Sequence, residues 1–179
     1  MVVKLYIWNI KSSWGHVSMA LEDGFYISWR PTYQVEKSPV NATEWVLARE
    51  QQTLQDDIRA EYGRLPVHAI KIIHQILDED KIKRWWLKFK ANNRYNLLTC
   101  NSSTVVYFAM REGGALDHVI DRQPRWWTPE DIKAFGEAVC FGYKTKGKAG
   151  VSFSPSDQQF VSHLGKVTSA GMVNSFLST

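Results

Sequence analysis

The chain has 179 residues, enough for one domain with a hydrophobic core and too few for two of ordinary size. Hydrophobic residues make up 44% of it and aromatic residues 13%, which excludes a disordered protein. The formal net charge of +4 is modest. Its basic clusters, KIKRWWLKFK and KTKGK, are explained by a solvated basic face, so we expect no nucleic-acid partner.

The two cysteines, Cys100 and Cys140, cannot build a disulfide framework, and no Cys/His cluster has the spacing of a metal site. We therefore expect no metal and no other cofactor. No window contains the roughly 18 apolar residues of a membrane span, and the N-terminal segment lacks the features of a signal peptide. The sequence thus predicts a cytoplasmic protein, or one exported by a system that needs no cleavable signal.

The first predicted elements are strands. The run VVKLYIWNI reads as one strand, and GHVSMALEDGFYISW reads as a hairpin that turns at Asp23-Gly24. In the first arm of the hairpin, side chains alternate between two faces. The apolar face is formed by Val17, Met19 and Leu21. The opposite, more polar face is formed by His16, Ser18 and Ala20, and we expect His16 at a strand end, outside the deep packing.

The middle of the chain alternates between helix and strand. A loop with two prolines, RPTYQVEKSPVNA, precedes a helix predicted from Asn41 or Thr43 to Gly63. The run LPVHAIKII predicts a strand. The run LDEDKIKRWWLKFKAN then predicts an amphipathic helix, because its apolar residues recur at i, i+3, i+4 and i+7.

Two further helices follow. The stretch YNLLTCNSSTVVYFAMREGG, residues 95–114, predicts a helix that begins in its Asn/Ser cluster and ends at Gly113-Gly114. A short helix is predicted after Thr128, which with Asp131 forms a capping box. We predict one α+β domain over residues 1–143, a small antiparallel sheet packed with helices, followed by a loosely ordered C-terminal arm over residues 144–179.

The start of the helix in TCNSSTVV is a candidate site for chemistry. A helix N-terminus presents unpaired N–H groups and lowers the pKa of a thiol, and the same groups can hold an oxyanion. Such a nucleophile needs a base, and among the five histidines His16 alone follows a glycine at the mouth of a hairpin. From spacing alone, a helix cap without catalysis explains these residues better than a catalytic site does.

Three stretches, WGHVSMALEDGFYISWRP, LDEDKIKRWWLKF and YNLLTCNSSTVVYFAMREGG, resemble the permuted papain-like branch of the NlpC/P60 superfamily, in particular small domains of bacterial toxins and effectors. The resemblance runs from about residue 4 to residue 114. It implies a papain-like architecture, a general-base role for His16, and a nucleophile at the position after Asn101. That position holds Ser102, whereas the family pattern has Cys.

Three explanations for this departure remain open. The chain carries an inactivating Cys-to-Ser change, it is a naturally altered or serine-using member, or Cys100 has taken over. Two residues rotate a helical side chain by about 200°, so Cys100 would face elsewhere. The dipole of the helix does not ionise a serine hydroxyl, so we expect a weak or inactive enzyme.

The residue that orients His16 is left open among four candidates, Ser28, His68, Asp56 and Asp57. Trp14, Trp29 and Tyr26 are expected near the base, where they would line a pocket or exclude water.

The resemblance implies acyl transfer at an amide or ester: hydrolysis, deamidation or acylation. The substrate would be a protein, a peptide or a lipid, and an inhibitor or immunity protein is a further candidate partner. The alternative is a non-catalytic module that holds a peptide or partner in the same cleft.

Overall fold

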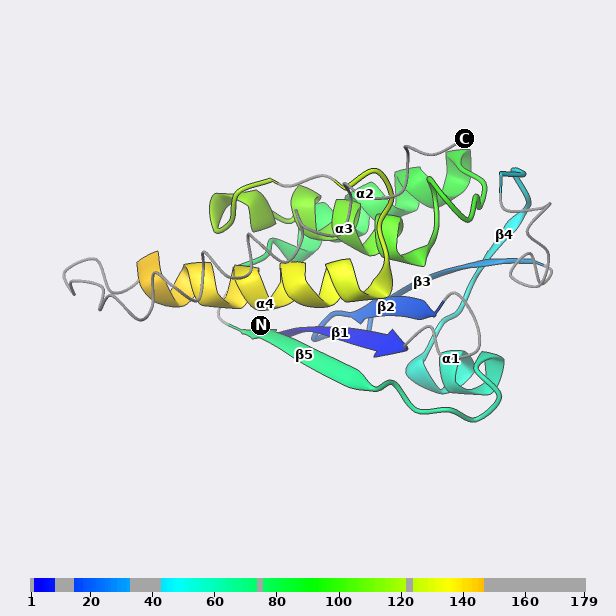
Figure 1. Ribbon diagram of the computed structural model, residues 1–179, viewed down its shortest axis with the longest axis horizontal. Coiled ribbons are helices and arrows are strands. Elements are labelled where there is room, and N and C mark those ends of the chain that lie inside the picture. The colour runs from blue at the N-terminus through cyan, green and yellow to red at the C-terminus, as the bar shows by residue number, and fades with distance from the viewer. Residues whose placement is uncertain (1, 9–14, 33–42, 74–75, 122–123, 147–179) are drawn as a thin grey trace, which may run out of the picture. The chain divides into compact units, whose positions relative to one another are not determined.

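The structure, a computed structural model, describes residues 2–8, 15–32, 43–73, 76–121 and 124–146. Five strands form one antiparallel sheet in the order β4-β3-β2-β1-β5 (Figure 1). The strands are β1 (Val2–Trp8), β2 (His16–Ala20), β3 (Tyr26–Pro31), β4 (Ala48–Glu50) and β5 (His68–Ile73). The helices are α1 (Leu54–Ala60), α2 (Glu79–Asn92), α3 (Ser102–Glu112) and α4 (Pro129–Lys146), with a 3-10 turn at Ala115–Asp117. The α+β class is confirmed.

The two faces of the sheet are covered by different helices. Helices α2, α3 and α4 lie on one side, and α1 lies on the other (Figure 1). The apolar residues of β2 turn toward α3, and Val17 and Met19 are fully buried there. This confirms the apolar face predicted for the first arm of the hairpin.

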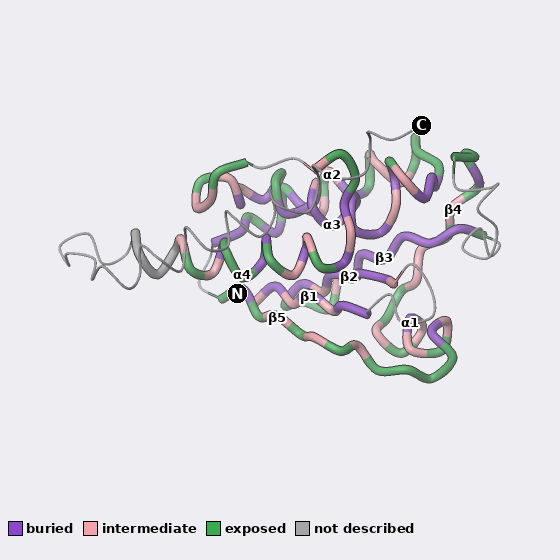
Figure 2. The backbone as a smooth tube through the Cα atoms, in the orientation of Figure 1, coloured by how far each residue is buried: buried purple, intermediate pink, exposed green. Residues whose placement is uncertain are grey.

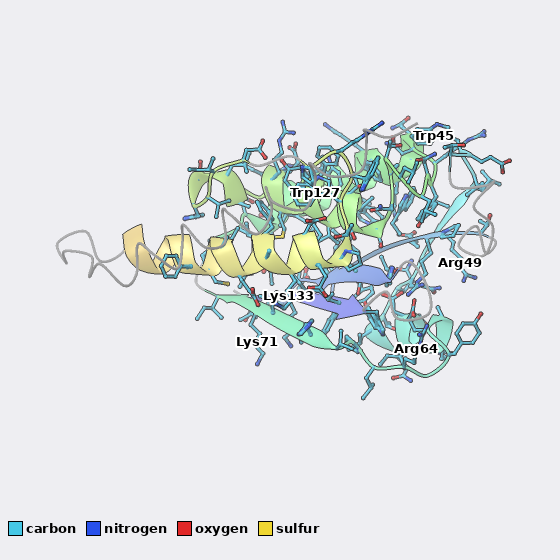
Figure 3. All side chains as sticks on the ribbon, viewed as in Figure 1. Trp45, Arg49, Arg64, Lys71, Trp127 and Lys133 are labelled. Carbon is cyan, nitrogen blue, oxygen red and sulfur yellow. The ribbon has the colours of Figure 1, made fainter. Side chains whose placement is uncertain are left out.

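Helix α3 is the central helix of the core. It contacts β2, β3, α2 and α4, and most of its side chains are buried. On α2, Ile82 and Trp86 are buried as their spacing predicts, and the Trp86 ring lies edge-on to Trp29 of β3, with centroids 5.5 Å apart. On the other side, Tyr107 of α3 stacks on Trp127, which lies among these helices (Figure 3).

The helix predicted up to Gly63 is wrong in its first half. Residues 48–50 form β4, which pairs with β3 and closes that edge of the sheet, and only Leu54–Ala60 is helical. Pairing with a strand edge has overridden local helix propensity here. The real start is Thr53, whose side chain accepts a hydrogen bond from the backbone N–H of Asp56 at 3.1 Å.

The last helix begins as predicted and is longer than predicted. Thr128 and Asp131 form the capping box, with Asp131 N–H donating to Thr128 Oγ1 at 3.2 Å and Thr128 N–H donating to Asp131 Oδ2 at 2.9 Å. The helix is not short, because Ile132, Phe135 and Val139 bury one face of it. It continues to Lys146, past the expected domain end at residue 143, and the predicted arm lies outside the described residues from 147 onward.

Candidate functional site

The polar face of the hairpin is buried, contrary to expectation. Ser18 pairs with Ser28 across the two strands, so His16, Ser28 and Arg30 share one face of the sheet. His16 is only 2% exposed. The prediction that His16 lies outside the deep packing is therefore wrong, because α1 covers this face and Figure 2 shows β2 and β3 buried along nearly their whole length.

Asp57 of α1 is the centre of the network on this face. It is 0% exposed, and its Oδ1 accepts hydrogen bonds from Ser28 Oγ at 2.9 Å and Arg30 Nε at 2.8 Å. Its Oδ2 accepts a third from the Tyr26 hydroxyl at 2.8 Å. Burial alone would raise the pKa of Asp57, but the hydrogen bonds from His16 and Arg30 and the charge of Arg30 hold the pKa below its usual range. Asp57 is therefore a buried anion.

The neighbours of His16 fix which ring nitrogen carries the proton. Nε2 lies 3.1 Å from Ser28 Oγ and 3.1 Å from Asp57 Oδ1. Ser28 donates its own hydrogen to Asp57, so both neighbours accept, and Nε2 must be the donor. Nδ1 is then the unprotonated nitrogen of the neutral ring.

The pKa of His16 lies below its ordinary value. Burial lowers it most and the charge of Arg30 lowers it further, while Asp57 opposes both. The imidazole is therefore neutral at pH 7, which is the state that a general base needs.

A second layer of charges holds Arg30 in place. Its Nη1 lies 2.9 Å from Glu61 Oε1, and the other Glu61 oxygen lies 2.9 Å from Arg64 Nη2. Arg64 follows α1, as Figure 3 shows. Four formal charges from β3, α1 and the segment after α1 thus alternate in sign behind His16.

Ser102 reaches the same hairpin from the core side. It is the first residue of α3, and its Oγ accepts a hydrogen bond from the Val17 N–H at 3.3 Å. Asn101 caps the helix by accepting from the Thr104 N–H at 2.8 Å, and its side-chain N–H groups bond Leu97 O and Trp127 O. The structure therefore brings the hydroxyl of Ser102 against the peptide that links residues 16 and 17.

Cys100 lies in a different environment. It precedes the helix and pairs through its backbone with Asn96, and it is 6% exposed. Burial raises the pKa of its thiol to about 11. The thiol is thus protonated at pH 7, which does not suit a nucleophile.

The other candidates for orienting His16 lie apart from it. Asp56 is bound by Thr53 Oγ1 at 2.7 Å and Arg59 Nη2 at 2.6 Å on the outer side of α1. His68 lies on β5, and β1 and β2 separate that strand from β3. Of the four candidates, Asp57 and Ser28 contact the imidazole.

The aromatic residues expected near the base divide between two faces. Tyr26 belongs to the network, but Trp29 points to the opposite face of β3 and packs on α2. Trp14 lies outside the described residues. The ring beside His16 is that of Trp8, with centroids 5.5 Å apart. Trp8 was missed, because its place opposite His16 follows from the register between β1 and β2 and not from the pattern of either strand alone.

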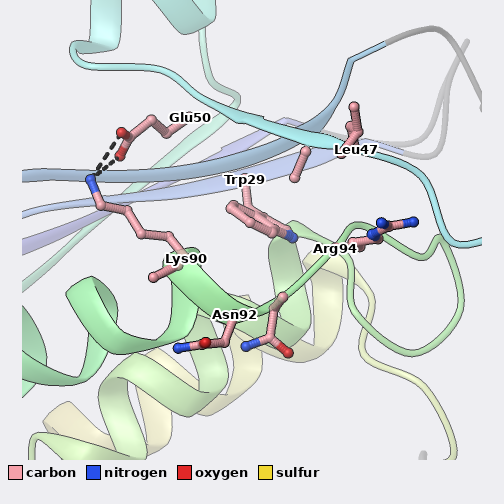
Figure 4. Close-up of a pocket in the computed structure, with 9 residues that line it drawn as sticks. Trp29, Leu47, Glu50, Lys90, Asn92 and Arg94 are labelled. Carbon is pink, nitrogen blue, oxygen red and sulfur yellow. Dashed lines mark hydrogen bonds and ion pairs between the residues drawn. The ribbon is translucent and has the colours of Figure 1, made fainter.

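A pocket of about 440 Å³ opens on the Trp29 side of β3 (Figure 4). Its wall includes Leu47, Arg94 and the pair formed by Lys90 Nζ and Glu50, whose oxygens both lie 2.9 Å from the ammonium. Consecutive strand residues point to opposite faces, so this pocket and the Asp57 network lie on opposite sides of β3. Its volume is at the lower end of the range for small-ligand sites.

Within the ranges that the structure describes, no group of His, Cys, Asp and Glu residues is arranged to hold a metal ion. In the same ranges, no helix has the length and apolar character needed to cross a membrane.

A comparison with protein families finds a match for the second half of the described domain. The model of the IcsB middle domain, a domain of a bacterial effector family, matches residues 66–143. This segment contains β5, α2, α3 and most of α4, so it includes Ser102 but neither His16 nor Asp57. No curated protein and no solved structure matches the chain. The chain is thus similar, over less than half of its length, to a domain of an effector family.

Proposed function

We propose that the chain is an effector-type domain that carries out acyl transfer on a permuted papain-like scaffold. Three segments distant in sequence supply its site: the hairpin supplies His16, α1 supplies Asp57, and the start of α3 supplies Ser102. The observation that carries the proposal is the pair of contacts on either side of residues 16 and 17. His16 Nε2 lies 3.1 Å from Asp57 Oδ1, and the Val17 N–H donates to Ser102 Oγ at 3.3 Å.

Each residue has a distinct role. Asp57 holds the imidazole by Nε2 and so leaves Nδ1 as the base. Position 102 supplies the nucleophile, a thiol in the family that the sequence resembles and a hydroxyl in this chain. The N–H groups at the start of α3, at residues 102 and 103, have no acceptor within the helix and can stabilise the oxyanion.

The substrate is an acyl compound whose amide or ester bond is attacked at position 102. A protein, a peptide or a lipid fits this chemistry, and the IcsB match favours a substrate outside the producing cell. An inhibitor or immunity protein that covers the site is a further expected partner.

The test restores a thiol at the proposed nucleophile position. In Ser102→Cys, iodoacetamide at pH 7 should alkylate the introduced thiol at least about tenfold faster than Cys140, because the helix N-terminus and His16 lower its pKa. Peptide mass spectrometry measures both rates in one sample. Adding His16→Gln should remove the difference.

A matched control is Ser103→Cys, which moves the thiol one residue along the same buried helix start. One residue turns the side chain by about 100°, away from the hairpin, so its alkylation should stay slow. Equal rates for the two variants, or a fast rate that survives His16→Gln, would refute the proposed roles.

The pocket beside Trp29 favours the second candidate, a module that binds a peptide or partner without catalysis. Leu47 and Arg94 at this pocket are exposed and could hold an apolar and an acidic group. This candidate predicts that the introduced thiol at position 102 reacts no faster than Cys140.

A further inference from the structure

The two edges of the sheet differ in what they leave open. Strand β4 has 3 residues, and the chain just before it is already paired, since Val46 and Tyr95 exchange backbone hydrogen bonds of 2.9 Å. Strand β5 has 6 residues, and among the residues that the structure describes it pairs with β1 alone. It is the outermost strand (Figure 1), and most of it is exposed or half-buried (Figure 2). Such an edge presents N–H and C=O groups to which another chain can add.

We propose that β5 is a docking site for an extended acidic segment of a partner protein. The segment adds to the sheet as a further antiparallel strand, the more stable of the two pairings, and places a carboxylate against Lys71 and Lys4. This surface, the β5 edge, lies on another part of the sheet than the network of His16 and Asp57. The inference therefore goes beyond the proposed function and does not depend on it.

Two lysines give the β5 edge its preference for an acidic partner. Lys4 of β1 lies directly opposite Lys71, so the two side chains share one face of the sheet, where like charges are unfavourable. Within the described ranges neither ammonium has an ion pair, whereas Lys83 and Lys90 are both paired with carboxylates. A carboxylate on an added strand would lie opposite Lys71. Lys4 is about 10 Å from that strand, within the combined reach of a lysine and a glutamate side chain.

The neighbours of Lys71 predict which residues flank the carboxylate of the partner. Ala69 and Ile73 lie two residues away on either side, so they share the face of Lys71, and both are exposed. Ile73 is 40% exposed and lies opposite Val2, so it can pack against an apolar side chain. Ala69 is small and lies opposite Tyr6, which leaves space above it for a large apolar side chain. The partner segment should therefore carry an acidic residue with apolar residues two positions before and after it.

The backbone of β5 can be reached by a donor from outside the ladder with β1. The carbonyl oxygen of Lys71 accepts a hydrogen bond from the Cys140 thiol of α4 at 3.6 Å. A thiol is a weak donor, so a backbone N–H of an added strand would make a stronger bond to the same carbonyl. Cys140 also marks the position of the β5 edge, because a strand bound there would lie beside its sulfur.

A second copy of this chain fits the β5 edge less well than an acidic segment does. The sequence of β5, HAIKII, contains no carboxylate, so pairing two copies of this strand would add positive charge beside Lys4 and Lys71. A lysine on an edge strand opposes self-association of this kind. The same charge favours a partner of opposite sign, and this gives the edge its selectivity.

The experiment measures the binding of a dye-labelled peptide, Thr-Val-Thr-Glu-Thr-Phe-Thr, to the full chain by fluorescence anisotropy. In an antiparallel pairing its Val, Glu and Phe lie opposite Ile73, Lys71 and Ala69. Lys71→Glu should weaken binding by about fivefold or more, and a peptide with Lys in place of Glu should prefer this variant to the unchanged chain. Lys88→Glu makes the same charge change on the exposed face of α2 and should alter the affinity by less than about twofold.

Two further measurements locate the bound peptide. A saturating amount of it should slow the alkylation of Cys140 by iodoacetamide, because the added strand covers the thiol. Successive N–H groups of a strand point to opposite sides. Methylating the backbone nitrogens of Val, Glu and Phe, or instead those of the threonines, should therefore abolish binding in one case and preserve it in the other.

Several results would overturn the inference. One is that the acidic peptide does not bind, or binds equally well to Lys71→Glu. Another is an unchanged alkylation rate of Cys140 in the presence of bound peptide, or an equal effect of the two methylation patterns. A full chain that is dimeric by light scattering and becomes monomeric as Lys71→Glu would assign the β5 edge to a second copy instead.

Discussion

The side chain of Asp57 has no contact with water, and both of its oxygens accept hydrogen bonds from the protein. Burying a carboxylate is costly unless its charge is paired and its lone pairs are filled. Here Arg30 supplies the charge, and Tyr26 and Ser28 supply neutral donors. This arrangement leaves His16 facing an anion whose position is fixed from three sides, which favours one orientation of the imidazole.

The buried histidine predicts how stability depends on pH. The pKa of His16 is lowered in the folded protein, so between that pKa and about 6.5 the unfolded chain binds a proton that the folded chain does not. The contribution of His16 to the free energy of unfolding should therefore be greatest above about pH 6.5 and decrease as the pH falls below that value. One such group contributes a slope of at most about 1.4 kcal/mol per pH unit.

Urea denaturation at pH 7.5, 6.5 and 5.5 measures this slope. We expect His16→Gln to reduce the slope, because glutamine does not titrate. Replacing Ile73, an exposed residue of β5 that does not titrate, should leave the slope unchanged. The assignment would be wrong if the two variants behaved alike.

The sequence narrowed the orienting residue to four candidates but could not choose between adjacent aspartates. On a helix, successive side chains are separated by about 100°, so Asp56 and Asp57 face different surroundings. Choosing between them requires the face of α1 that packs on the sheet, and this depends on contacts with β3, which lies far away in the sequence. Cys100 and Ser102 could be ranked as nucleophile candidates from the sequence. Both lie at the start of one helix, where two residues of separation turn a side chain by about 200°.

At the scale of elements, the site depends on a short helix. Helix α1 has 7 residues, too few to be stable alone, and it brings Asp57 to the sheet. Its N-terminus is closed by Thr53, whose hydroxyl accepts from the Asp56 N–H and donates to the Asp56 carboxylate at 2.7 Å. The orientation of His16 therefore depends on a cap that does not itself touch the site.

Removing the Thr53 cap should slow the reaction of a thiol at position 102, although it changes no residue of the proposed site. Thr53→Ala should destabilise α1 by about 1 kcal/mol and slow the alkylation of Ser102→Cys in the double variant. Thr128→Ala removes a cap of the same kind from α4 and serves as the matched control. We expect similar losses in the urea midpoint for the two cap variants but slower alkylation only for Thr53→Ala; equal alkylation rates would contradict the role given to α1.

Local sequence signals were sufficient to predict an element where its own residues include the turn or cap that ends it. The hairpin has its Asp-Gly turn, α3 its cap and its terminal glycines, and α4 its capping box, and all three were predicted. The helix predicted from Asn41 or Thr43 could have been placed correctly from the sequence. Thr53-Leu54-Gln55-Asp56 has the spacing of a capping box and so indicates a helix that starts at Thr53. That signal was hidden inside a longer run with high helix propensity. Strand β4 had no such signal, because only its pairing with β3 defines it.

At the scale of the described part of the chain, the sheet separates two kinds of environment. Its α3 side is apolar, and its α1 side carries the buried ions, so His16 and Ser102 approach the start of β2 from different faces. Groups on opposite faces of a sheet can come close to each other at the end of a strand, because the sheet no longer lies between them there. The α+β class could be predicted from the order of elements along the chain. The approach of His16 and Ser102 to the start of β2 could not, because it depends on the antiparallel order β4-β3-β2-β1-β5.

The extent of the folded domain follows from where the core ends in the sequence. The last fully buried core residue described is Val139 of α4, and Gly142 comes into contact with the backbone of His118. Both positions need the last turns of α4 to be formed. We therefore propose that residues 1–146 contain the domain that folds cooperatively, and that the boundary first expected at residue 143 would cut the helix short.

This boundary predicts different behaviour for two truncated chains. A chain that ends at Lys146 should unfold in urea with the midpoint of the full chain and, as Ser102→Cys, react with iodoacetamide at the same rate. A chain that ends at residue 135 loses Val139 from the core and should be less stable by about 1–3 kcal/mol or more. If the chain ending at Lys146 lost its cooperative transition, residues 147–179 would belong to the fold. The separate C-terminal arm predicted from the sequence would then be wrong.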